Sequence, residues 1–254
     1  MRKQTGIFIF CMAAGLLICS HRSAAQNTYK DLQKLELNSS QAIIPVPTGG
    51  ALQGKGLDSW MNGLGPGGEA GVIRGFSGST KTEEQKFFAL GSLYTALLVQ
   101  AGSSSTVEAG KAIGDFRQAL TQLQAPSGFF GYLSELELMT KSRVANAAVA
   151  ARMAGAIQGF VSDFVHSRGD TAFLNYRAGQ WATTLALAAH AHDAAGLQLS
   201  AATYFQEKYA TQHPSNQTLA ALKGLAELGG KEKLDDADFV KIENLAEQLR
   251  DQLS

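Results

Sequence analysis

Cysteine, which can form stabilising disulfides, and proline, which interrupts helices, are both scarce in this sequence. Its 254 residues include two cysteines, Cys11 and Cys19, and five prolines, of which only Pro126 and Pro214 follow residue 82. After residue 19 the chain therefore has no disulfide, no thiolate metal ligand and no cysteine nucleophile. The scarcity of proline permits long uninterrupted helices over the C-terminal two thirds.

The first 25 residues have the order of a secretory signal peptide. Arg2 and Lys3 come first, residues 7–19 form an apolar run, and small residues at 23–25 precede Gln26. The run is shorter than the ~20 residues that a membrane-spanning helix needs. We predict that residues 1–25 are removed and that the protein is exported, to the periplasm or outside the cell. The alternative is a lipoprotein anchored through Cys19.

Charge excludes two classes of partner. Removing Arg2, Lys3 and Arg22 with the leader leaves 19 of the 22 basic residues against 22 acidic ones, a net charge of about −3. Binding to nucleic acid or to an anionic membrane needs a cationic surface. We therefore expect no nucleic-acid partner and no electrostatic docking on a membrane. Because Arg152, Gln158 and Asp163 interrupt the apolar segment 143–167, we also expect no stable membrane span in the mature chain.

Composition divides the mature chain into two parts. Residues 48–78 include 11 glycines, which disfavour both helix and strand. We therefore predict an extended, Gly-rich N-terminal arm over residues 26–80. From residue 81 to residue 254 the apolar side chains recur at helical spacing, which predicts an all-helical domain.

The helical domain is expected to contain eight helices. Thr82 with Gln85 and Ser105 with Glu108 have the spacing of capping boxes, and Asp170 is expected to cap a helix that extends to about Ala194. The remaining expected helices are 129–141, 143–167, Leu197–Gln212, Thr218–Leu228 and Asp235–Leu253. Short connections favour antiparallel neighbours, so the fold class is all-α: an antiparallel multi-helix bundle or a short helical-hairpin solenoid.

Two of these helices carry explicit packing predictions. In 129–141 the apolar residues Tyr132, Leu133, Leu136 and Met139 are expected to point inward. In 143–167, Val149, Met153, Ile157, Phe160 and Phe164 form a bulky stripe, and Ala147, Ala151, Gly155 and Gly159 form a stripe of small residues. Because small residues allow helices to approach closely, we expect 143–167 to be a central packed helix.

Residues 87–126 resemble a tetratricopeptide repeat. The matching positions are Phe87, Leu90-Gly91 and Tyr94 on the first helix, then Ala112, Phe116, Ala119 and Pro126 on the second. The loop between them is ~9 residues longer than in that family. The resemblance implies a solenoid with a concave surface that binds peptides or proteins.

No set of His, acidic and nucleophilic residues converges in the sequence, so we predict no enzyme, no catalytic residue and no cofactor. The leading hypothesis is an exported protein that acts by binding another protein or by self-association within an assembly. The alternative is a periplasmic protein that binds a small ligand or metal, possibly a hydrolase, through His190 and Asp193 on one helix face. His192 is expected to point the opposite way. A third hypothesis is an exported effector that acts on host proteins.

Overall fold

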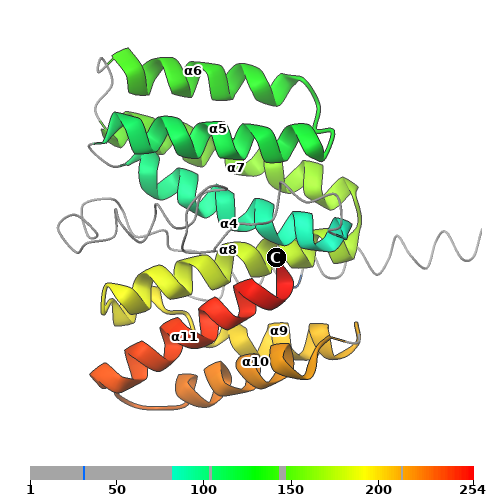
Figure 1. Ribbon diagram of the computed structural model, residues 1–254, viewed down its shortest axis with the longest axis vertical. Coiled ribbons are helices and arrows are strands. Elements are labelled where there is room, and N and C mark those ends of the chain that lie inside the picture. Colours follow the sequence, from blue (N-terminus) through cyan, green and yellow to red (C-terminus); the bar gives the residue numbers. More distant parts are fainter. Residues whose placement is uncertain (1–30, 32–81, 103–104, 143–146, 213) are drawn as a thin grey trace, which may run out of the picture.

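The computed structural model describes residues 31, 82–102, 105–142, 147–212 and 214–254. Within these residues there are eight α-helices, one short 3-10 helix and no strand, so the all-α multi-helix bundle is confirmed (Figure 1). The helices are α4 (Glu83–Ala101), α5 (Thr106–Gln122), α6 (Gly128–Ser142), α7 (Ala147–Ser167), α8 (Asp170–His190), α9 (Ala201–Ala210), α10 (Asn216–Gly229) and α11 (Asp236–Leu253).

Helix α8 is the centre of the bundle. It packs most extensively on α4 and, on another side, on α11 (Figure 1). Every residue of α8 from Ala172 to Ala189 is buried, and α4 is almost as completely enclosed from Phe87 to Ala101. The single apolar face that the sequence predicts for α4 and α8 therefore includes fewer residues than are buried in the structure. A helix surrounded by other helices has no solvent-facing side to mark in its sequence.

Two glycines bring α4 and α8 into backbone contact. A Cβ atom built at Gly91 would lie 2.0 Å from the carbonyl oxygen of Tyr176, and one built at Gly179 would lie 2.0 Å from that of Phe88. The hydroxyl of Ser92 donates a hydrogen bond to the Gly179 carbonyl oxygen at 3.3 Å. Any side chain at either glycine would separate the helices, so this crossing requires glycine in both.

Several helix ends follow from local sequence. The capping box of Thr82 and Gln85 is confirmed, and Asp235 forms a second box with Asp238. Ser105 accepts a hydrogen bond from the Glu108 amide at 3.3 Å. These side chains satisfy amides that have no partner within their own helix.

Other helix ends differ from the prediction. Asp170 is the first residue of α8 rather than its cap; the cap is Gly169, whose φ of +112° suits glycine. Helix α8 ends at His190, because Asp193 caps the 3-10 helix Ala194–Gly196 instead. The expected helix Leu197–Gln212 is also shorter in the structure, where α9 spans Ala201–Ala210.

The prediction that 143–167 is a central packed helix is wrong. Helix α7 lies on the flank, in contact with α4, α6 and, less extensively, α8. Its Phe160 is 49% exposed, and a Cβ at Gly155 or Gly159 would meet no described atom within 4 Å. The side chains of Ala147 and Ala151 are outside the described residues.

The predicted signal peptide, its two cysteines and nearly all of the Gly-rich arm lie outside the described residues. From that part Asp31 is described, and its carboxylate lies 3.7 Å from the Lys208 ammonium group of α9. Among the helices that the structure describes, none combines the length and apolar composition of a membrane span.

Candidate functional site

Exposed apolar side chains concentrate on helices α6 and α7. Five large hydrophobic residues are exposed in the described part of the chain, and three of them belong to these two helices: Tyr132, Leu138 and Phe160. The rings of Tyr132 and Phe160 stack, with centroids 5.3 Å apart and planes 21° from parallel. We call the surface formed by Tyr132 and Phe160 the α6–α7 face.

Helix α6 presents this face because its other side is fixed to the bundle. Leu133 and Leu136 are completely buried, and the Phe129 ring meets that of Phe164 edge-on at 5.9 Å. The prediction that Tyr132 points inward is wrong: it is 44% exposed, since its inner neighbours already fill the contact with α5 and α7.

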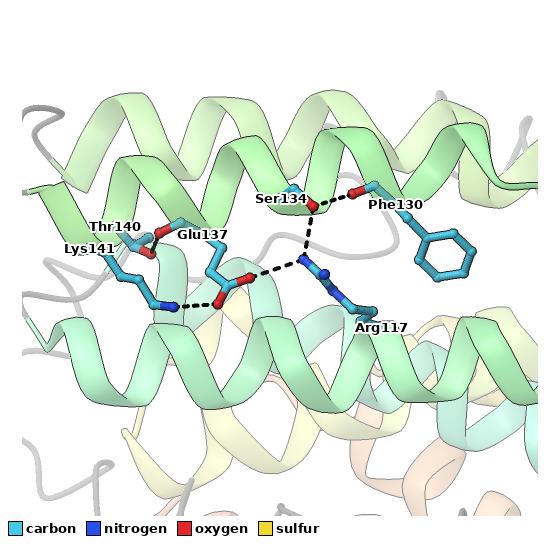
Figure 2. A network of polar contacts seen from close by, with 6 residues as sticks. All are labelled: Arg117, Phe130, Ser134, Glu137, Thr140 and Lys141. Carbon is cyan, nitrogen blue, oxygen red and sulfur yellow. Dashed lines mark hydrogen bonds and ion pairs between the residues drawn. The ribbon is translucent and has the colours of Figure 1, made fainter.

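A polar network on the α5 side fixes the rotation of α6 (Figure 2). The Arg117 guanidinium of α5 donates to the Ser134 hydroxyl at 3.3 Å and lies 3.1 Å from the Glu137 carboxylate. The other oxygen of Glu137 accepts from Lys141 at 2.6 Å. This hydrogen bond, with the smaller effect of Arg117, lowers the pKa of Glu137, so the carboxylate stays charged.

The outward side of α7 is a single helical stripe. Ile157, Val161 and Val165 point into the bundle, whereas the opposite positions are exposed or half-exposed. These outward positions are Arg152, Gly155, Ala156, Gly159, Phe160 and Asp163. The stripe therefore combines small residues, one large ring and one charge of each sign at its two ends.

The C-terminal end of α7 is fixed to α5. The Arg168 guanidinium donates to the carbonyl oxygen of Leu123 at 3.0 Å and lies 5.2 Å above the Phe164 ring. Leu123 is the C-terminal cap of α5, so the cation satisfies a carbonyl that has no partner within its own helix. Three contacts therefore hold the helices of the α6–α7 face in place: the ring pair Phe129–Phe164, the ion pair Arg117–Glu137 and the hydrogen bond from Arg168 to Leu123.

The histidine region that the sequence singled out has a different organisation. His190 Nδ1 lies 2.9 Å from a carboxylate oxygen of Glu243 on α11. The Asp193 carboxylate accepts hydrogen bonds from the amides of Ala195 and Gly196 at 3.2 and 3.3 Å. The two predicted ligands thus have different partners, one joining two helices and the other ending a turn.

The predicted orientation of His192 is wrong. Helix α8 ends at His190, and His192 has a left-handed backbone with φ of +52°. Its ring turns onto α11, where it stacks on Phe239 at 4.8 Å with Nδ1 3.4 Å from the Asp236 carboxylate. Both histidines consequently face α11, because helical periodicity no longer applies beyond the last helical residue.

A buried polar cluster in α8 had no recognisable signal in the sequence. Arg177 donates to the Gln180 side chain at 2.8 Å, and Gln180 donates to the Tyr176 hydroxyl at 3.1 Å. Beside them, the Tyr209 hydroxyl donates to Asn175 at 2.8 Å. Burial raises the pKa of both tyrosines, so they stay protonated. A guanidinium, two amides and two neutral phenols supply no base or nucleophile, and we interpret the cluster as structural.

The described residues contain no group of three or more His, Cys, Asp or Glu side chains arranged to hold a metal ion. Comparison of the chain with known protein families, curated proteins and solved structures finds no match in any of the three. The tetratricopeptide resemblance thus receives no support there, and its Gly91 contacts α8 rather than the following helix.

Proposed function

We propose that this is an exported, non-enzymatic helical protein that acts by binding a protein partner through the α6–α7 face. The observation that carries the proposal is the exposed stack of Tyr132 and Phe160 on an otherwise well-packed bundle. Single exposed apolar residues are ordinary, but two exposed aromatic rings stacked across neighbouring helices are typical of an interaction site.

The side chains of the α6–α7 face are ordered before a partner binds. Aromatic side chains contribute much of the energy of protein interfaces, and binding usually has to immobilise them. Here Tyr132 and Phe160 already restrict each other by stacking, and the Arg117–Glu137 ion pair fixes α6 behind them. Binding of a partner would therefore cost little side-chain entropy at Tyr132 and Phe160, which favours binding by a small surface.

The alternative function, binding of a small ligand or metal at His190 and Asp193, has less support. The Asp193 carboxylate already accepts two backbone amides, and His190 lies against Glu243. Recruiting either side chain to a ligand would first break these contacts, each of which stabilises the native fold.

The test is capture of partners from the exported fraction. The wild-type chain, Phe160→Ala and the control Val240→Ala are each crosslinked in that fraction and their partners identified. Val240 on α11 is 54% exposed, which makes it a matched exposed apolar residue away from the face. We expect a partner with wild type and the control and at least tenfold less with Phe160→Ala. Equal capture by all three, or none by any, contradicts the proposal.

Export is tested separately by N-terminal sequencing of the protein recovered outside the cytoplasm. A chain beginning at Gln26 supports processing after residue 25. A chain that stays in the cytoplasm with Met1 intact contradicts export, whatever its partners.

A further inference from the structure

The outward stripe of α7 has a property that suits one particular partner. Its charged residues lie at opposite ends, Arg152 one and a half turns before the centre of the stripe and Asp163 one and a half turns after it. The small residues Ala156 and Gly159 lie equally far on either side of the same centre, between residues 157 and 158. A helix with this pattern is complementary to an antiparallel copy of itself.

We propose that the α7 stripe is the interface of a two-fold symmetric homodimer, in which α7 packs antiparallel on α7 of a second copy. This inference rests on the proposed function and names the partner of the same surface. In a two-fold symmetric dimer every contact occurs twice, because each copy presents the same surface to the other.

Close approach is possible at the centre of this pairing. Antiparallel alignment about residues 157 and 158 brings Ala156 to the level of Gly159 of the second copy. A Cβ at Gly155 or Gly159 meets no described atom of its own chain within 4 Å, so this surface is open for a neighbour. Small residues at a helix crossing allow the two backbones to approach and increase van der Waals contact.

The ends of the stripe supply charge complementarity. The same alignment brings Arg152 to the level of Asp163 of the second copy, and the symmetry axis repeats the pair. Both side chains are exposed, so the pairs lie on the rim of the interface, where charge determines orientation and register more than affinity. A parallel pairing would instead place like charges together, which disfavours it.

The exposed ring completes the contact on one flank. Met153 is two helical turns before Phe160 and therefore lies on the same side of α7. In the antiparallel pair, Phe160 comes within a turn of Met153 of the second copy, where a thioether and an aromatic edge make a favourable contact. Tyr132, stacked on Phe160, would be covered by the same approach.

The area is modest, one helix pair with a contribution from α6, so we expect a dissociation constant on the order of 10 µM. Sedimentation velocity of the full chain, as purified from cells, over a concentration series from about 1 to 500 µM brackets this value. Arg152→Asp and Asp163→Arg should each weaken the dimer at least tenfold, because each change places like charges opposite one another.

Mixing the two charge variants gives the decisive control. A heterodimer of Arg152→Asp with Asp163→Arg restores an opposite-charge pair at both ends, and so does a homodimer of the chain carrying both changes. Either should dimerise within about threefold of wild type, a rescue that a merely structural role of these residues would not produce. Gly159→Leu should abolish dimerisation, whereas Gly114→Leu, at an equally open glycine of α5, should leave it unchanged.

Three outcomes would overturn the inference. These are a strictly monomeric wild type at the highest concentration, a dimer unaffected by Gly159→Leu, and charge variants without rescue on mixing. If the monomer is nevertheless captured by a different exported protein through Phe160, the homodimer is wrong and the proposed function stands. If neither self-association nor capture occurs, both are wrong.

Discussion

The α4–α8 crossing provides the sharpest test of the fold, through the substitution Gly91→Ala. The added methyl carbon would lie 2.0 Å from the Tyr176 carbonyl oxygen and 2.9 Å from the Gln180 nitrogen, whereas ordinary contact begins at 3.4 Å. Both obstacles are backbone atoms of a buried helix, so no side chain can rotate away. The helices must separate by about 1.4 Å, the difference between 2.0 and 3.4 Å.

The magnitude follows from two opposing effects. A gap of 0.5–1 Å already loses roughly a quarter to a half of each van der Waals contact across it, and overpacking of a core costs ~1–3 kcal/mol or somewhat more. Alanine has a helix propensity ~1 kcal/mol better than that of glycine, which offsets part of this cost. Because both clashing atoms belong to the backbone, we expect a cost at or just above the top of that range, ~3–4 kcal/mol. After the propensity gain is subtracted, Gly91→Ala should lower the free energy of unfolding by about 2–3 kcal/mol.

Urea denaturation followed by circular dichroism measures this effect. The matched control is Gly114→Ala in α5, where a Cβ meets no described atom within 4 Å. It should stabilise the protein by ~0.5–1 kcal/mol through helix propensity alone. If Gly91→Ala were as stable as Gly114→Ala, the close crossing of α4 and α8 would be incorrect.

A double mutant tests whether the two glycines share one contact. Gly179→Ala places its Cβ 2.0 Å from the Phe88 carbonyl oxygen, and a single separation of the helices would relieve both clashes. The loss in the double mutant should therefore be clearly smaller than the sum of the single losses. Strict additivity would show that the two sites act independently, contrary to this reasoning.

Two further predictions concern α11 and its neighbours. The hydrogen bond from Lys231 at 2.6 Å lowers the pKa of Asp238, so its contribution to stability is present above the unfolded value of 3.8 and is lost as pH falls through the lower native value. The stability difference between wild type and Asp238→Asn, measured by urea denaturation from neutral to acid pH, should therefore shrink on acidification; a difference independent of pH would contradict this. For the ligand alternative, we expect no bound metal by elemental analysis of the native protein and no shift of its melting temperature with zinc, copper or iron. Stoichiometric metal that His190→Ala removes would reverse that conclusion.

The sequence predicted the fold class and most helices because those depend on local chemistry. Apolar spacing of three and four residues, proline positions and capping side chains act within one or two turns. Thr82 with Gln85 accordingly caps α4, and Ser105 caps α5 through the Glu108 amide, as their spacing indicated. Errors of a few residues arose where two local signals competed, as when Asp193 caps a 3-10 turn rather than allowing α8 to continue.

Which helix is central and which residues are exposed were decided by tertiary packing alone. Helices α7 and α8 both carry apolar and small residues, but only α8 is enclosed on all sides in the part of the chain that the structure describes. Glycine illustrates the reason: Gly91 and Gly155 are chemically identical, yet one lies against the backbone of α8 and the other faces open space. The sequence by itself determined the all-helical class and the local caps, and its export signal stays a prediction. Only the arrangement of helices in space placed Tyr132 and Phe160 on the surface, because burial depends on neighbours distant in the chain.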